Sequence, residues 1–143
     1  MTLEEKQCAL IAELVQIRNG QENFARLVAR ARQKPPLDAS LKRDDFLVEG
    51  CMSKLWFVPT YRDGKCFFQA ESDSAVVKGI ASLICEFYSG STPAEILAYN
   101  RAFLAAVGIS RHLTANRRSG LGRLTERIRA FAAAHLEPAP SNT

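Results

Sequence analysis

The sequence predicts an α+β domain with a small antiparallel sheet, and three observations lead to this fold class. Apolar residues recur with helical spacing in the first 34 residues and again after residue 72. Between these regions, residues 46–71 are rich in apolar and β-branched side chains, as strands are. The order helices, strands, helices is typical of α+β domains and argues against a parallel βαβ fold.

Two helices are expected in the N-terminal part. Thr2 and Glu5 have the spacing of a capping box, and a stripe of leucine and isoleucine follows until Asn19-Gly20 ends the helix. Residues 22–34 repeat the helical period. Pro35-Pro36 ends this second helix, because proline has no amide to donate and clashes with the preceding turn.

The strands are expected around one hairpin. Residues 46–48 begin an extended stretch that breaks at residues 49–51, and residues 55–58 carry the strongest strand pattern. Asp63-Gly64 predicts a tight turn, because both residue types tolerate positive φ. Residues 66–71 then return antiparallel to the first strand.

A core helix and two shorter helical segments should follow the strands. Ser72-Asp73 is interpreted as the N-cap pair of a helix with a wide apolar stripe that ends at Gly90. Thr92-Pro93 predicts the start of a short helix that fades near Asn100. Residues 103–107 are expected to add another helical turn.

The last long helix should begin at Thr114 as N-cap and end near Leu136. After it, residues 137–143 contain two prolines and are predicted to form a disordered tail. A chain of 143 residues with 47% hydrophobic residues has the size of one compact domain. We therefore expect a single domain over residues 1–136.

The composition and the N-terminal residues lead to an expectation about where the protein is located in the cell. Charged residues make up 24% of the chain, and they interrupt every apolar run well before the ~20 residues that a membrane span needs. The acidic N-terminus lacks the basic start and apolar core of a secretory signal. These features predict a soluble, cytoplasmic protein. The net charge of +4 lies in the ordinary range and decides nothing alone.

The cysteine and glycine patterns predict no resident cofactor. In a reducing compartment the four cysteines should be free thiols. No two of them are two residues apart, and His112 and His135 are distant from all four, so the local spacing of a structural zinc site is missing. The glycines match neither phosphate-binding fingerprint.

One cysteine differs from the others in its setting. Cys8, Cys66 and Cys85 lie within predicted helices or strands, where free cysteine usually packs as a small buried hydrophobe. Cys51 follows Gly50 at the point where a strand breaks, and a thiol on a loop can reach a partner without unfolding the domain. Cys51 is therefore the candidate reactive thiol.

The region of the last helix is rich in arginine. Its six arginines are Arg111, Arg117, Arg118, Arg123, Arg127 and Arg129. They are interpreted as a solvated basic face, as a surface for an acidic protein partner, or as a nucleic-acid site. The last interpretation is the weakest, because aromatic residues for base stacking are nearly absent there.

Three segments occur in a recognisable order: residues 48–56, residues 71–79 and residues 112–121. The first contains the pattern Gly-Cys-x-Ser-x-x-Trp, which is more specific than the other two. Together they resemble the SufE/CsdE family of sulfur acceptors, and the likeness spans roughly residues 3–136.

The resemblance implies a fold and a site. The family fold packs a three-stranded antiparallel sheet against helices and is similar to the IscU-type scaffold. The match implies that Cys51 takes sulfane sulfur as a persulfide, with Gly50 and Ser53 in the same motif. Asp73 and Arg117 match family positions near the cysteine loop, where we expect them to help hold or release it.

The resemblance also implies partners. The donor would be a pyridoxal-phosphate cysteine desulfurase of the SufS or CsdA type, which the chain would stimulate, and the recipient a SufBCD-like iron–sulfur scaffold complex. The chain would bind no cofactor and would act as a transferase-like carrier and activator rather than as an independent enzyme. Whether it forms a homodimer stays open.

Two other function classes compete with the carrier. The same loop cysteine, Cys51, is compatible with a stand-alone thiol redox enzyme such as a peroxidase, although no resolving cysteine is evident. The arginine-rich last helix is compatible with a nucleic-acid-binding module. We expect neither nucleic acid nor a membrane as a partner.

Overall fold

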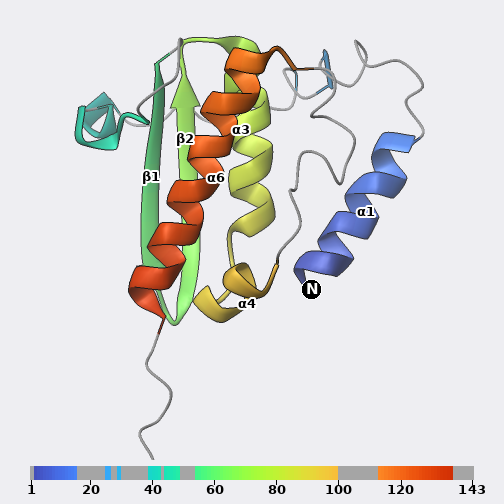
Figure 1. Ribbon diagram of the computed structural model, residues 1–143, viewed down its shortest axis with the longest axis vertical. Helices are drawn as coiled ribbons and strands as arrows, with labels where there is room; N and C mark the ends of the chain where they lie inside the picture. Colours follow the sequence, from blue (N-terminus) through green and yellow to red (C-terminus); the bar gives the residue numbers. More distant parts are fainter. Residues whose placement is uncertain are drawn as a thin grey trace, which may run out of the picture.

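The computed structural model confirms the α+β class and shows helices α3 and α6 beside a hairpin of strands (Figure 1). It describes residues 2–15, 25–26, 29, 39–42, 44–48, 54–99 and 113–136. The regular elements are α1 (Leu3–Val15), β1 (Leu55–Arg62), β2 (Lys65–Ser72), α3 (Ala75–Tyr88), α4 (Pro93–Ala98) and α6 (Ala115–His135), with 3₁₀ turns η1 (Ala39–Leu41) and η2 (Asp44–Phe46). Most of the predicted helix 22–34, the turn at 103–107 and the tail 137–143 lie outside the described residues.

The turn between β1 and β2 forms as predicted. Asp63 has φ 54° and Gly64 has φ 76°, the left-handed pair that a two-residue hairpin requires. The strands then pair antiparallel from Arg62 opposite Lys65 to Leu55 opposite Ser72. The start of β1 therefore lies beside the end of β2.

The third strand implied by the family resemblance is not confirmed. Within the described residues the sheet has two strands. Isolated antiparallel bridges extend it at two points, Leu47 to Trp56 of β1 and Ser91 to Cys66 of β2. The residue after Leu47, Val48, donates its amide to the Leu55 carbonyl (2.8 Å). Residues 49–53, which would follow it, lie outside the described part of the chain.

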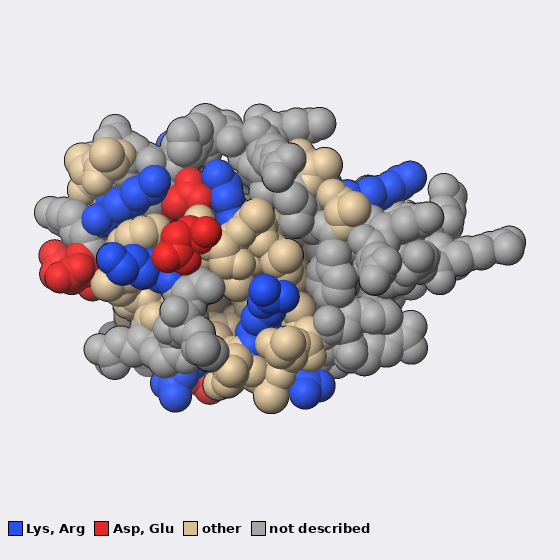
Figure 2. Space-filling view, turned by 90° about the horizontal axis from the view of Figure 1, so that it is seen from above, with Lys and Arg blue, Asp and Glu red and all other residues tan. Residues whose placement is uncertain are grey.

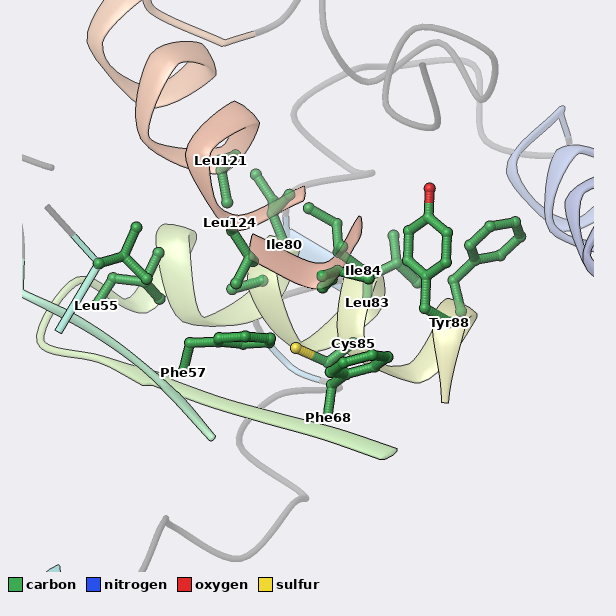
Figure 3. Close-up of a cluster of buried hydrophobic side chains, with 14 of the residues drawn as sticks. Leu55, Phe57, Phe68, Ile80, Leu83, Ile84, Cys85, Tyr88, Leu121 and Leu124 are labelled. Carbon is green, nitrogen blue, oxygen red and sulfur yellow. The ribbon is translucent and has the colours of Figure 1, made fainter. Parts of the chain in front are cut away.

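The core lies between one face of the hairpin and the two long helices (Figure 3). Phe57 and Phe68 stack on this face with ring centroids 5.6 Å apart. Ile80 and Ile84 of α3, both fully buried, and Leu124 of α6 pack against them. Each such side chain contributes roughly 1.5–3 kcal/mol by leaving water. The prediction that the third helix is a core helix is confirmed.

Three predicted helix starts are also confirmed. Thr2 and Glu5 form the reciprocal capping box, because each side chain accepts a hydrogen bond from the other's backbone amide. Thr92 accepts from the Glu95 amide at the start of α4 (3.2 Å). Thr114 accepts from an amide of the first turn of α6, which ends at the cap Leu136.

The predicted N-cap of α3 is wrong by one or two residues. Ser74, rather than Ser72-Asp73, caps this helix and accepts from the Val77 amide. The Ser72 hydroxyl is occupied elsewhere: it donates to the Lys54 carbonyl (2.7 Å) and accepts from the Ser74 amide (3.1 Å). Ser72 thus ends β2 instead of starting α3.

Two of the three cysteines expected to be buried are buried. Cys66 is fully buried and Cys85 is 3% exposed, and burial raises the pKa of the Cys66 thiol. The expectation for Cys8 is wrong, because its thiol is exposed. α1 buries Leu3 and Gln7, and a step of one residue turns Cys8 by about 100° away from that face.

Lysine and arginine side chains join the helices through carbonyl groups. The Lys6 ammonium on α1 donates to the carbonyls of Phe87 and Ser89 at the end of α3 (both 3.0 Å), and burial lowers its pKa. Arg129 on α6 donates to the carbonyls of Tyr99 (2.9 Å) and Ile96 (3.3 Å) at the end of α4. Both contacts satisfy carbonyls that a helix end leaves without an amide.

The basic face expected on the last helix is therefore only partly present. Arg117, Arg118 and Arg123 are exposed, whereas Arg127 and Arg129 are half-buried and bound to backbone carbonyls. Because Arg127 and Arg129 bind carbonyls of the chain itself, fewer arginines of this helix are available to contact nucleic acid. Among the described residues, no helix is both long and apolar enough to span a bilayer.

Arg129→Met should lower the free energy of unfolding by about 2 kcal/mol, because charged hydrogen bonds to the half-buried carbonyls of α4 are lost. Urea denaturation measures this change. Arg118→Met removes an exposed charge from the same helix and should change stability by no more than about 0.5 kcal/mol. Equal losses in the two variants would contradict the capping role.

Tyr88 should make the protein less stable at alkaline pH. Burial, with a smaller effect of Tyr99, raises the pKa of Tyr88 from 10.0 to about 12. Between these values the unfolded chain loses the phenolic proton while the folded chain keeps it, so stability falls as pH rises. The free energy of unfolding of wild type, measured relative to Tyr88→Phe, should therefore drop by up to about 3 kcal/mol over this interval. A constant difference would contradict the shift.

Candidate functional site

Three of the five predicted site residues, Gly50, Cys51 and Ser53, lie outside the described residues, whereas Asp73 and Arg117 are described. The site is therefore defined by the two ends that hold the segment 49–53. These ends are close together along the hairpin and belong to the described part of the chain.

The two ends of the segment are joined by backbone pairing. Val48 precedes it and donates its amide to the carbonyl of Leu55, at a distance of 2.8 Å. Cys51 is three residues from Val48 and three from Lys54, so its Cα atom can lie no more than about 11 Å from either of theirs. The candidate thiol is therefore linked, through three residues on each side, to the end of the sheet where β1 begins.

On the C-terminal side, the segment is attached to the corner between β2 and α3. The carbonyl of Lys54 accepts two hydrogen bonds, one from the Ser72 hydroxyl (2.7 Å) and one from the Asp73 amide (3.3 Å). Asp73 therefore contacts the chain near Cys51 through its backbone, and its side chain is exposed to solvent. The structure thus places this predicted residue beside Lys54, at the C-terminal end of the segment.

An ion pair between a buried carboxylate and a partly buried ammonium supports the same corner. Glu71 is only 4% exposed, and its carboxylate contacts the Lys78 ammonium on α3 at 3.1 Å. The same carboxylate oxygen accepts from the Ser72 amide (3.1 Å). Removing the Lys78 ammonium would be destabilising, because the Glu71 carboxylate would stay buried and lose an ion pair. The family resemblance included residues 71–79, but the sequence did not reveal that Glu71 and Lys78 form an ion pair.

On the N-terminal side, the segment is attached to α6. The guanidinium of Arg127 donates to the carbonyl of Leu47 (2.7 Å) and lies over the ring of Phe57, 5.8 Å from its centroid. Sequence reasoning counted Arg127 only as part of a basic helix and missed this role. No local pattern reveals it, because the partner is 80 residues away in the chain.

Two helix N-termini lie at this end of the molecule. α3 begins directly after the Asp73 contact, and α6 begins at the same end in Figure 1. Arg117 is exposed in the first turn of α6, where its amide donates to the Thr114 hydroxyl. Between Arg117 and Asp73, both described, the structure shows no ion pair. Positive helix ends favour an anion such as a thiolate.

A hollow of about 380 Å³ opens beside Leu47 and Val48. Residues from η2, from the segment before residue 49 and from α6 line it: Asp44, Asp45, Leu47, Val48, Arg123, Glu126 and Arg127. Figure 2 views the molecule from this end and shows acidic and basic side chains next to an uncharged area. Within the described ranges, no group of three or more His, Cys, Asp or Glu side chains could hold a metal ion.

Comparisons with known proteins identify the family. The family model described as "SufE: Fe-S metabolism associated domain" matches residues 8–132. A solution structure of a hypothetical protein from Thermus thermophilus is similar, with a TM-score of 0.71 and 18% sequence identity. The alignment covers 94% of this chain and 98% of that chain, and it supports the fold.

Ser72→Ala should weaken the corner that holds the segment, because the Lys54 carbonyl loses a donor and the Ser74 amide loses an acceptor. We expect the free energy of unfolding to fall by about 1–3 kcal/mol, measured by urea denaturation. Ser119→Ala, at an exposed position of α6, is the matched control and should stay within about 0.5 kcal/mol of wild type. A stability of Ser72→Ala equal to that of the control would refute the attachment.

Proposed function

Since the chain belongs to the SufE family, which associates it with iron–sulfur metabolism, we propose that it accepts sulfane sulfur on Cys51 from a cysteine desulfurase. The single observation that carries this proposal is the family match over residues 8–132, a range that includes the Gly-Cys-x-Ser-x-x-Trp segment. The attachment of both ends of segment 49–53 to the folded core supports it.

The transfer is a thiol–disulfide-type exchange. The Cys51 thiolate attacks the outer, sulfane sulfur of a persulfide on the desulfurase. A new sulfur–sulfur bond forms to Cys51, and the sulfur–sulfur bond of the donor persulfide breaks. The desulfurase cysteine leaves as a thiolate, so electrons balance without an external oxidant or reductant. Cleavage of the carbon–sulfur bond of the substrate cysteine belongs to the partner and its pyridoxal phosphate.

The described surroundings fit a nucleophilic thiolate. The N-terminus of α3 follows the contact between Asp73 and Lys54 directly, so its positive end lies near the C-terminal side of the segment. An adjacent positive potential lowers the pKa of a cysteine and raises its thiolate fraction. Within this proposal, Gly50, Ser53, Asp73 and Arg117 hold or release the segment that carries the thiol.

Delivery completes the proposed role. The Cys51 persulfide would pass its sulfane sulfur to a SufBCD-like scaffold complex by the same type of exchange. The chain needs no cofactor for either step, because every bond that changes is a bond to sulfur. It would therefore act as a carrier, and its stimulation of the desulfurase would follow from removing the sulfur that occupies the enzyme's cysteine.

Incubation with a cysteine desulfurase and L-cysteine should add the mass of one sulfur atom to the chain, as measured by intact-protein mass spectrometry. The added mass should disappear under a thiol reductant and should be absent from Cys51→Ser. The matched control is Cys8→Ser, because Cys8 is an exposed thiol on α1. This variant should gain sulfur as wild type does.

Two results would overturn the proposal. One is a wild-type chain that gains no sulfur, and the other is an unchanged gain in Cys51→Ser. Peroxide consumption without a desulfurase would instead favour a thiol peroxidase. Cys66 and Cys85 are ill-suited to resolve a sulfenic acid in such an enzyme, because both are buried in the core.

A further inference from the structure

Arg127 is the side chain by which α6 contacts the segment leading to Cys51. Two contacts fix its guanidinium: a 2.7 Å hydrogen bond to the Leu47 carbonyl, and a position over the Phe57 ring. Phe57 belongs to the buried core and is 1% exposed. The guanidinium is therefore held by the rigid part of the molecule on one side and binds the segment on the other.

The hydrogen bond acts where β1 pairs with the segment that leads to Cys51. Among the described residues, this pairing consists of the bridge between Leu47 and Trp56 and the bond from the Val48 amide to the Leu55 carbonyl. An additional charged donor on the Leu47 carbonyl therefore stabilises this end of the segment, and its loss leaves a half-buried carbonyl without that partner.

The two sides of the segment are held by different means. On the C-terminal side, the Lys54 carbonyl accepts hydrogen bonds from Ser72 and Asp73. These two residues form the corner between β2 and α3. On the N-terminal side, α6 holds Leu47 through one long side chain that lines a hollow of about 380 Å³. Cys51 is four residues from Leu47 and three from Lys54, so both contacts act close to it along the chain.

We propose that Arg127 is a positioning residue for sulfur transfer: it fixes Leu47 so that the segment 49–53 presents Cys51 to the donor persulfide. This inference rests on the proposed function of Cys51. In-line attack on a sulfane sulfur requires the thiolate at a defined distance and direction, and misplacement by about 1 Å can cost up to ~100-fold in rate. Arg127 acts through the backbone and does not touch the reacting sulfur atoms.

Arg123 provides a matched control on the same helix. It lines the same hollow and carries the same charge, but it is exposed, and its side chain makes no hydrogen bond to another described residue. Replacing either arginine by methionine changes the net charge equally. A difference between the two variants therefore reports the bond to Leu47 rather than the electrostatic attraction of a partner.

The experiment measures single-turnover sulfur transfer from a persulfide-loaded desulfurase to wild type, Arg127→Met, Arg127→Lys and Arg123→Met. We expect the maximal rate of Arg127→Met to fall about tenfold, with a smaller change in the half-saturating concentration of the chain. Arg127→Lys should recover part of the rate, because lysine retains a charged donor. Arg123→Met should stay within about twofold of wild type.

Amide hydrogen exchange on the free variants supplies a readout that does not need the desulfurase. In Arg127→Met, protection of the Val48 amide should fall about tenfold. Arg129→Met, which loses bonds to Ile96 and Tyr99 but none to Leu47, lowers the overall stability and should leave protection of Val48 close to that of wild type. A tenfold loss at Val48 in both variants would therefore overturn the proposal, as would unchanged exchange of Val48 in Arg127→Met.

The transfer results separate the two proposals. A wild-type chain that gains no sulfur overturns the proposed function itself. Normal transfer by wild type together with an unchanged rate in Arg127→Met, or an equal loss in Arg123→Met, overturns only the role of Arg127. A lower rate confined to Arg127→Met and partly rescued by Arg127→Lys supports it.

Discussion

The register between β1 and β2 follows from the turn at Asp63 and Gly64, and it determines where the candidate site lies. Leu55 at the start of β1 is paired with Ser72 at the end of β2. Lys54 thus meets the corner from which α3 departs, where two donors bind its carbonyl. A slip by one residue would turn every strand side chain to the opposite face and break the hydrophobic core.

The same register also orients the core side chains, and their packing positions α6 next to the candidate site. Alternation along the strands places Leu55, Phe57 and Phe68 toward α3 and α6 (Figure 3). Burial of these side chains fixes α6 close enough for Arg127 to reach the carbonyl of Leu47. The result is a rigid two-layer core with a short segment attached at both ends, an arrangement in which a loop can carry chemistry that the scaffold positions.

Local signals predicted much of this fold, whereas contacts distant in sequence could not be predicted. The Asp-Gly turn and the caps at Thr92 and Thr114 depend on neighbours three residues away or fewer, so the sequence reveals them. The roles of Arg127 and Arg129 depend on carbonyls 80 and about 30 residues away, which no local pattern records. The misplaced cap of α3 has the same cause: the Ser72 hydroxyl binds Lys54, 18 residues earlier.

Burial divides the three described thiols into two classes, two buried and one exposed. Cys66 and Cys85 lie in the core between β2 and α3, where attack by a persulfide would require the core to open. Cys8 is exposed, but it lies on α1, where the nearby Lys6 contacts the end of α3, whereas β1 begins beside the start of α3. Exposure alone therefore does not identify a carrier thiol. Selectivity for Cys51 would then follow from position, because segment 49–53 is attached where a helix N-terminus and two anchoring contacts converge.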